Sequence, residues 1–316
     1  MYQQGRRLYP QELLKVSQAV PPIKDAGSSD TLPEPSVTIV VLSLERIHLT
    51  RRTINSIYSN TNYPFNVLVF DNGSSPSTIS ELQNLAADYD NLQVYHNSTN
   101  LGVAGGRNQA FSMVKSEYVV SFDNDILCHP GWLRETMKCA VMYQSSFVAP
   151  LRLDVSGKVW SHGSELKYTS NVEVIEIARW FHDLPLDYVQ SLFAKKSFPT
   201  NFLSGGAGFF NVEAFTTCGG FDPAFEAFED IDFSLRLTRK GYSVWTTPEA
   251  QLTHDDEWIP NSKLDIDYAR THYDLSKLNR AAARFKLIWG VDVFPQKYVR
   301  AYRNRLNSKL GQQSSG

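Results

Sequence analysis

The stretch that decides the fold reads Tyr118-Val119-Val120-Ser121-Phe122-Asp123-Asn124-Asp125. Its first five residues are mostly β-branched or aromatic, and the three that follow are polar. A short apolar run without alternation is typical of a strand that is buried on both faces of a parallel sheet. Two more apolar runs lie at 37–42 and 67–70, and the second leads into the turn-forming residues 71–75. The sequence therefore predicts buried strands, two of which run into carboxylate-bearing segments.

Helical patterns separate these strands. Helices are expected at 49–57, at 79–87 and up to about residue 115, and a short strand is expected at 92–95. Alternation of strands and helices with short connections predicts an α/β fold, in which helices flank a Rossmann-like, mostly parallel central sheet. Because ligands of such sheets bind beyond the carboxyl ends of the strands, we expect the site near Asp71 and Asp123.

The chain divides into three expected parts. An arm and linker at 1–35 precedes the main domain at 36–260, and a helical extension with a basic tail follows at 261–316. Within the second half, residues 151–200 are predicted to be loops with an aromatic helix near Trp180 and Phe181. Further helices are predicted at 229–239 and 269–286.

Composition and charge exclude several classes of protein. The formal net charge is −2, so no basic field indicates a nucleic-acid partner. Three cysteines are too few for a disulfide framework or a zinc cluster, and we expect reduced thiols in a cytoplasmic protein. No apolar run approaches the roughly 20 residues that cross a bilayer, and the N-terminus lacks a signal-peptide core.

The tail at 297–316 carries basic residues and no acidic ones. Apolar residues are interleaved with them, which fits a weak peripheral contact with the anionic inner face of a membrane. A solvated basic helix is the alternative. The basic residues are Lys297, Arg300, Arg303, Arg305 and Lys309.

The pair Asp123 and Asp125 has the chemistry of a metal site. Hard oxygen ligands at positions i and i+2 beyond a buried strand can hold Mg²⁺ or Mn²⁺ and leave positions for water and phosphate oxygens. Three other Asp-x-Asp pairs, beginning at residues 88, 230 and 265, show that the spacing alone is common. His254, near the end of a predicted late strand, would complete a mixed site suited to Mn²⁺.

Other candidate residues carry a structural and a functional interpretation. The glycine-rich segment 205–208 is either a turn or a place where the backbone approaches a donor sugar or diphosphate closely. Glu229 and Asp230 fit the acidic first turn of a helix, and the same place can present a catalytic carboxylate. Several aromatic side chains are candidates for an acceptor-facing wall, with a place in the core as the alternative: Trp160, His162, Trp180 and Trp258.

Six segments in a fixed order carry a family resemblance. They lie at 37–42, 63–74, 100–108, 122–125, 219–222 and 228–233, and they are followed by Arg236, Gly241-Tyr242 and His254. In this order they resemble the inverting glycosyltransferases of family 2, which have the GT-A fold with a smaller acceptor-side region. The resemblance is strongest to the branch that contains bacterial rhamnosyl- and galactofuranosyltransferases. Residues 42–46 depart from the Pro-Thr-Tyr-Asn-like stretch of many members.

The resemblance implies a role for each matching residue. Asp71 would read the edge of a uracil or thymine ring, Asp123 would contact the donor ribose, and Asp125 would ligate the metal. His254 would close the metal site, to which Asp123 also belongs. Asp230 would be the catalytic base, with Glu229 as the second candidate. The residues expected near the nucleotide are Asn100, Gly102, Arg107 and Asn108, and those expected near the donor sugar or acceptor are Gly205, Gly206, Trp160, His162 and Trp258.

The implied activity is sugar transfer with inversion, assisted by Mn²⁺ or Mg²⁺. The donor would be a nucleotide sugar, with UDP or dTDP favoured and a guanine nucleotide as the alternative. The acceptor would be a hydroxyl of a carbohydrate or glycolipid in cell-envelope polysaccharide assembly. Two other functions remain open, namely a non-catalytic carbohydrate-binding or scaffold protein and a sugar nucleotidyltransferase. The second normally needs a glycine-rich loop after the first strand, and 42–46 contains no glycine.

Overall fold

The computed structural model describes residues 35–168, 174–193, 196–293 and 295–311. Nearly all of the expected arm at 1–35 therefore lies outside the described residues. Within the described part of the chain, no helix combines the length and the apolar character that a bilayer crossing requires.

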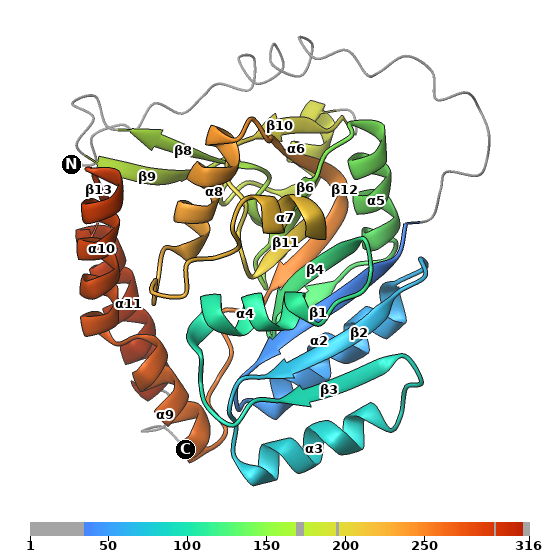
Figure 1. The fold of residues 1–316 in the computed structure, drawn as a ribbon, viewed down its shortest axis with the longest axis vertical. Coiled ribbons are helices and arrows are strands. Elements are labelled where there is room, and N and C mark those ends of the chain that lie inside the picture. Colours follow the sequence, from blue (N-terminus) through green and yellow to red (C-terminus); the bar gives the residue numbers. More distant parts are fainter. Residues whose placement is uncertain (1–34, 169–173, 194–195, 294, 312–316) are drawn as a thin grey trace.

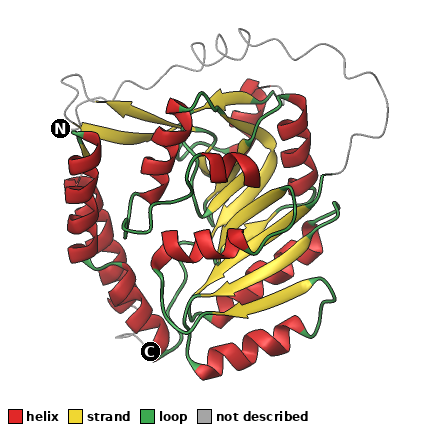
Figure 2. Ribbon diagram, viewed as in Figure 1, coloured by secondary structure: helices red, strands yellow, loops and turns green. Residues whose placement is uncertain are grey.

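A mixed sheet forms the centre of the described structure (Figures 1 and 2). Its strands are β1 (Val37–Ser43), β2 (Asn66–Asp71), β3 (Leu92–His96), β4 (Tyr118–Asp123), β5 (Ile126–Cys128), β6 (Phe147–Leu153), β7 (Val159–Ser161), β10 (Phe198–Thr200), β11 (Ala207–Asn211) and β12 (Val244–His254). The main order is β10-β12-β6-β11-β4-β1-β2-β3, while β5 pairs with β12 and β7 with β6. Strands β1, β2, β3 and β4 pair with one another in parallel, whereas β11 is antiparallel to both β4 and β6.

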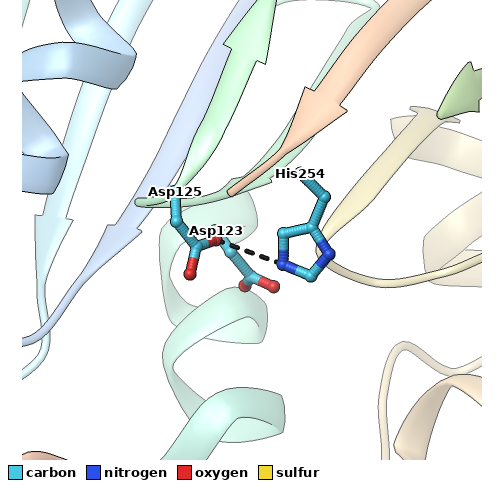
Figure 3. Close-up of side chains that lie close together, drawn as sticks. All are labelled: Asp123, Asp125 and His254. Carbon is cyan, nitrogen blue, oxygen red and sulfur yellow. Dashed lines mark ion pairs between the residues drawn. The ribbon is translucent and has the colours of Figure 1, made fainter. Parts of the chain in front are cut away.

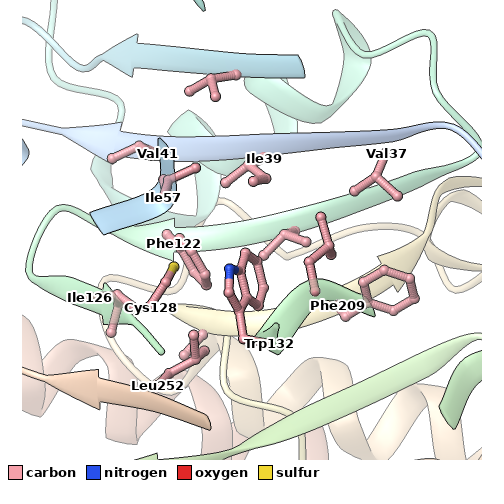
Figure 4. Close-up of a cluster of buried hydrophobic side chains, with 14 of the residues drawn as sticks. Val37, Ile39, Val41, Ile57, Phe122, Ile126, Cys128, Trp132, Phe209 and Leu252 are labelled. Atoms are coloured by element: carbon pink, nitrogen blue, oxygen red, sulfur yellow. The ribbon is translucent and has the colours of Figure 1, made fainter. Parts of the chain in front are cut away.

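Helices cover both faces of this sheet, as the alternation in the sequence predicts. One face packs on α2 (Ile47–Asn60), α3 (Pro76–Ala86) and α5 (Trp132–Met142), and the other on α4 (Gly102–Ser112), α7 (Val212–Thr217) and α8 (Glu229–Arg239). On the first face, Trp132 lies fully buried with its ring centroid 5.1 Å from that of Phe122 (Figure 4). Burial on both faces explains why β1 and β4 read as unbroken apolar runs.

A smaller sheet and a helical layer complete the described fold. The sheet contains β8 (Ser164–Tyr168), β9 (Val174–Arg179) and β13 (Asp292–Val293), and the remaining helices are α6 (Leu186–Phe193), α9 (Lys263–His272), α10 (Leu275–Trp289) and α11 (Pro295–Gly311). Figure 1 shows α9 and α10 one after the other along one flank, with α11 packed beside both. Through Trp258 and Ala269 this layer packs against Leu49 of α2, next to the end of β1.

The structure corrects two of the predicted elements. Residues 151–200 are not mainly loops but contain short strands and the helix α6, and Trp180 and Phe181 follow β9 instead of lying in a helix. The predicted helix at 269–286 is two helices, because the side chain of Asp274 accepts a hydrogen bond from the Ser276 amide and starts α10 afresh. The remaining predicted strands and helices of the described residues are present, with ends shifted by a few residues.

Candidate active site

The register of the sheet brings the two predicted carboxylate segments to one edge. Strand β1 lies between β2 and β4, so that Ser43 pairs with Asp71 on one side and Leu42 with Asp123 on the other. Because all three strands are parallel, these residues share the carboxyl-terminal edge of the sheet. Ligands of such sheets bind beyond the carboxyl ends of the strands. The apolar strand residues end at this edge and polar side chains follow them, so we expect the site there.

Asp123, Asp125 and His254 form a potential metal-binding group (Figure 3). One ligand atom from each residue lies within 4.8 Å of the others. His254 reaches the group because β12 pairs with β5, where His254 lies opposite Ile126, the residue after Asp125. Atom Oδ1 of Asp125 faces Nε2 of His254 at 3.4 Å. The three residues therefore converge from two segments that are far apart in the sequence.

The donor atoms of this group fit a divalent cation. Among the described residues, Oδ1 of Asp125 is a buried atom without a hydrogen-bond partner, and buried polar atoms are rarely left so. Two carboxylates and one imidazole suit Mn²⁺, and the carboxylates suit Mg²⁺ as well. Burial by itself would raise the pKa of Asp125, but the contacts with His254 and Arg46 hold that pKa far below its usual range. Asp125 is therefore ionised and ready to ligate.

Arg107 links the carboxylates on opposite sides of the site. Its guanidinium donates from Nη2 to Oδ1 of Asp123 at 2.5 Å and from Nη1 to Oε1 of Glu229 at 3.0 Å. The arginine side chain is 2% exposed, whereas that of Asp123 is 39% exposed. Asp123 is thus held from behind by a buried cation and remains accessible on its other side.

Glu229 and Asp230 begin helix α8, as the acidic-first-turn interpretation expects. Phe228, just before them, adopts a left-handed conformation with φ of 67°, which is costly for a bulky residue and is held by surrounding packing. Burial, and after it the charge of Glu229, raises the pKa of Asp230 to about 7. Asp230 keeps intermediate exposure. It is therefore a carboxylate that can exchange a proton near neutral pH.

Comparison with known proteins places this geometry in a family. The family described as "Glycosyl transferase family 2" matches residues 38–217, more than half of the chain. This chain belongs to glycosyltransferase family 2. The match includes β1, β2, β4 and the Asp123 and Asp125 pair, while Asp230 and His254 lie beyond it.

Relatives of this family 2 chain include two proteins named for O-antigen synthesis. O-antigen biosynthesis protein RfbC of Myxococcus xanthus is 26% identical over 247 residues, which are 74% of this chain and 19% of that protein. O-antigen chain rhamnosyltransferase RfbN of Salmonella typhimurium is 22% identical over 231 residues, 72% of this chain and 68% of that protein. The chain thus spans less than a fifth of the length of RfbC.

Solved structures support the GT-A fold of this glycosyltransferase. The structure of GalNAc-T7 with UDP, GalNAc and Mn²⁺ has a TM-score of 0.57 at 14% identity, covering 87% of this chain and 58% of that one. The mannosyltransferase PcManGT of Pyrobaculum calidifontis, in complex with GDP-Man and Mn²⁺, has a TM-score of 0.54 at 19% identity, covering 98% and 83%. At these identities the likeness shows the fold.

The glycines at 205 and 206 serve close packing within the family 2 site. A Cβ added to Gly206 would lie 2.6 Å from Cγ of Asp123, and one added to Gly205 would lie 2.5 Å from Nη1 of Arg107. The Gly206 carbonyl also accepts a hydrogen bond from the Asp123 amide at 2.9 Å. The absence of side chains here lets the protein's own charged groups approach the backbone, a use of glycine that neither sequence interpretation named.

All four residues expected near the nucleotide make contacts within the protein, and those of Arg107 are described above. The Asn100 side chain accepts from the Gly102 amide at 2.8 Å, where Gly102 begins α4 with φ of 71°. Asn108 donates to the Phe221 carbonyl at 2.7 Å and accepts from its amide at 2.9 Å. Asn108 therefore ties α4 to the Gly219–Gly220 turn. Asn100 and Gly102 lie beside the end of β2, where the Asn72 side chain donates to Oδ1 of Asn100 and to the Gly102 carbonyl.

The Asp71 carboxylate is held by groups of the protein itself. Its side chain is fully buried and accepts hydrogen bonds from the amide and hydroxyl of Ser74. Nδ1 of His96, at the end of β3, lies 2.6 Å from Oδ2 of Asp71, the oxygen that also accepts from the Ser74 amide. Because the His96 side chain is 36% exposed, a ligand at this edge would meet His96 before Asp71.

The aromatic candidates separate into different environments. Trp160 lies edge-on to His254, with ring centroids 6.0 Å apart, and Arg179 stacks over it at 4.4 Å. His162 is fully buried beside Phe198, and burial lowers its pKa to about 3, so the structure does not bring it to the acceptor side. Trp258 is 5% exposed in the layer of C-terminal helices. Trp160 is therefore the one of these three that adjoins the metal-binding group.

Sequence reasoning missed Arg46, His96 and Arg152. Arg46 donates to Asp125 and to Asn124, and Arg152 donates to Ser204 at 3.2 Å. Burial, and after it the charge of Arg179, lowers the pKa of Arg152 to about 10, whereas the charge of Asp230 raises this pKa. No motif marks these residues. The departure of 42–46 from the pattern of the family was the available signal, and it contains Arg46.

Proposed function

We propose that this chain is a metal-dependent inverting glycosyltransferase that moves a sugar from a nucleoside-diphosphate sugar to an acceptor hydroxyl. The observation that carries the proposal is the convergence of Asp123, Asp125 and His254 at the carboxyl edge of the sheet. These residues would hold Mn²⁺ or Mg²⁺, which as a Lewis acid offsets the charge that develops on the departing diphosphate. The ion pair of Arg107 with Asp123 is consistent with this role, because it holds one side of the carboxylate and leaves the other side accessible.

Asp230 is the proposed general base. The acceptor hydroxyl must lose a proton as it attacks, and a base with a pKa near the working pH takes that proton most effectively. The pKa of Asp230, raised to about 7 by burial and by Glu229, meets this condition. Glu229 is engaged with Arg107 at 3.0 Å, so it has the weaker claim. One base that acts opposite the leaving group would invert the anomeric centre.

The donor and acceptor are proposed at the level of chemical class. We favour UDP or dTDP as the carrier, on the resemblance of Asp71 to a base-reading residue, and GDP is the alternative. The neighbouring structures bear UDP and GDP-Man respectively, so they do not choose between these bases. The O-antigen names of RfbC and RfbN favour an acceptor in cell-surface polysaccharide or glycolipid assembly.

Isothermal titration of UDP, dTDP and GDP, each with and without Mn²⁺, tests the proposal. Wild type and Asp125→Ala would be compared, and Arg134→Ala would serve as a control because Arg134 is exposed and donates to the Asn62 carbonyl, away from the metal-binding group. Metal-dependent binding of one nucleotide, lost in Asp125→Ala and kept in the control, supports the site and selects the base. Absence of nucleotide binding under every condition would contradict it and favour a non-catalytic binding or scaffold protein.

A peripheral membrane contact through α11 is a subsidiary proposal. Arg305 and Lys309 face inward, toward Asp256 and the backbone of Trp258, while Arg300 and Arg303 remain exposed. The charge of these two would support a weak contact with anionic lipid. Flotation with anionic liposomes should therefore fall for Arg300→Glu with Arg303→Glu. Equal flotation of the wild type and the double variant would reject the contact.

A further inference from the structure

Arg46 occupies an unusual position between the metal-binding group and the C-terminal helices. It follows β1 in a left-handed conformation, with φ of 48°, directly after Glu45 with φ of 50°. Two successive non-glycine residues in this region are energetically costly. The Glu45 carboxylate stabilises the turn by accepting from the Ser75 amide at 2.7 Å and from the Thr78 hydroxyl at 2.6 Å. The strained turn has one evident result, which is the inward direction of Arg46.

The guanidinium of Arg46 holds one side of the metal-binding carboxylate. Its Nη2 donates to Oδ1 of Asn124 at 2.6 Å, and its Nη1 donates to Oδ2 of Asp125 at 3.3 Å. The other oxygen of Asp125, Oδ1, faces His254. The planar fork therefore engages one carboxylate oxygen and leaves the second directed at the proposed metal position.

Aromatic rings of the C-terminal region hold the guanidinium in turn. The carbon Cζ of Arg46 lies 3.8 Å from the ring centroid of Tyr268, in α9, and 4.9 Å from that of Trp258. Arg46 is 7% exposed and Trp258 is 5% exposed, so these cation–π contacts are shielded from water and correspondingly strong. We call Arg46, Trp258 and Tyr268 the arginine clamp.

Helix α11 fixes the segment that carries Trp258. The buried ammonium of Lys309 donates to the carbonyl oxygens of Asp256 and Trp258, and Arg305 donates to Oδ2 of Asp256 at 2.6 Å. These bonds fasten the backbone that immediately follows His254. The C-terminal helices thereby contact the metal-binding group by two routes, one through His254 and one through Arg46.

We propose that Arg46 is a positioning residue, and that the C-terminal helices set the geometry of the metal site by holding it in the arginine clamp. The proposal rests on the proposed metal-dependent function and adds a residue and a region to it. Arg46 orients Asp125 as a ligand through a single oxygen, and Tyr268 and Trp258 prevent the guanidinium from moving with the carboxylate. The helices beyond residue 260 are then part of the catalytic apparatus without touching the substrate.

The positive charge of Arg46 should weaken Mn²⁺ binding, whereas its positioning of Asp125 should strengthen it. A suitable variant separates these two effects. A cation beside a metal ligand weakens cation binding by repulsion, so a neutral replacement would mix a gain with a loss. Arg46→Lys keeps the charge but removes the planar fork, and a lysine cannot bridge Asn124 and Asp125 in the same way. Its effect therefore reports the positioning role alone. Tyr268→Leu keeps the fork and the charge and removes the ring beneath them.

The test is titration of Mn²⁺ into the full chain, alone and with saturating UDP, dTDP or GDP, followed by electron paramagnetic resonance. Arg46→Lys should weaken Mn²⁺ binding about tenfold or more, as loss of partners that orient metal ligands does. Tyr268→Leu should weaken it about threefold to tenfold. Tyr268→Phe retains the ring, and Arg51→Lys changes a side chain that is 43% exposed in α2, the helix that follows Arg46. Both should stay within twofold of wild type.

The line shape of bound Mn²⁺ should also broaden or split in Arg46→Lys and in Tyr268→Leu, because the ligand Asp125 is no longer held in place. This readout separates positioning from stability, since a merely destabilised protein would keep the native coordination in its folded fraction. Wild-type affinity and line shape in both variants would overturn the positioning role and leave the metal site intact. Loss of affinity in Tyr268→Phe equal to that in Tyr268→Leu would also overturn the clamp. If the wild type bound no Mn²⁺ under any condition, the proposed metal-dependent function would fail first.

Discussion

Substitution of Gly206 by alanine offers a sharp test of how the site is built. The new Cβ would lie 2.6 Å from Cγ of Asp123 and closer still to its Oδ2. Since non-bonded carbon atoms prefer about 3.5–4.0 Å, the carboxylate must move by about 1 Å. Metal ligand distances hold to within about 0.2 Å, so Asp123 would leave the metal-binding group. We expect Mn²⁺-dependent nucleotide binding to weaken by at least about tenfold.

The same substitution should cost little stability. The Asp123 side chain is 39% exposed and can turn toward solvent, so the cost should be near the lower end of the roughly 1–3 kcal/mol typical of overpacking. Titration calorimetry measures the binding, and urea unfolding measures the stability. Gly311→Ala, where an added Cβ meets nothing within 4 Å, is the matched control.

A double-mutant cycle decides whether the effect of Gly206→Ala passes through Asp123. In an Asp123→Ala background the carboxylate that collides is gone, so adding Gly206→Ala should cause no further loss of binding. Undiminished binding in Gly206→Ala alone would refute the reasoning. An equal loss in both backgrounds would also refute it, because the glycine would then act on something other than Asp123.

Three further predictions concern Asp230, Arg107 and Asn108. Asp230→Asn should lower turnover about 10²- to 10⁴-fold with nucleotide binding retained, and wild-type turnover should rise with pH through about 7, as measured by pH–rate profiles with the donor that calorimetry selects. The pKa of Asp230 in the folded protein lies above its ordinary value of 3.8, so the folded state holds the proton to higher pH than the unfolded state does. Its contribution to stability is therefore fully present below pH 3.8 and is lost as the pH rises through about 7. Urea unfolding should therefore show Asp230→Asn gaining stability over wild type between pH 5 and 8, and a constant difference would contradict the raised pKa. Arg107→Met should cost about 3 kcal/mol of unfolding free energy, because it leaves Glu229 and Asp123 without their cation, and a loss below about 1 kcal/mol would argue against a buried pair. Asn108→Ala should cost about 1–3 kcal/mol by leaving both backbone groups of Phe221 unpaired, with nucleotide affinity within threefold of wild type, and a larger loss of affinity would indicate direct contact with the donor.

The family comparison and the site geometry rest on different parts of the chain. Membership of glycosyltransferase family 2 rests on residues 38–217, a segment that supplies Asp123 and Asp125. Asp230, His254 and the arginine clamp come from later residues, where tertiary contacts carry the argument. The proposed base and the proposed positioning region can therefore fail while the family assignment stands.

Local sequence could predict the parallel strands β1 to β4 and the helices α2, α3, α4 and α8 that pack on the sheet. The strands at 37–42, 67–70 and 118–122 are apolar on both faces, and this pattern has few structural solutions besides a buried parallel strand. Carboxylates that directly follow such strands must lie at the carboxyl edge, so Asp123 and Asp125 were placed correctly by pattern alone. Prediction failed at 151–200 because its strands are short and partly exposed, and their pattern lacks the long apolar run that marks the central sheet.

The sequence by itself thus determined the parallel strands β1 to β4, the helices α2, α3, α4 and α8 and the strand-end carboxylates, since each depends on neighbours a few residues away. The tertiary structure decided which distant groups meet them. Arg46 and Asp125 are 79 residues apart, and Lys309 reaches the Trp258 carbonyl across 51 residues. It also decided that His162 is buried while Trp160 adjoins His254. Such contacts leave no periodic trace in the chain, because side-chain direction and long-range packing fix them rather than backbone preference.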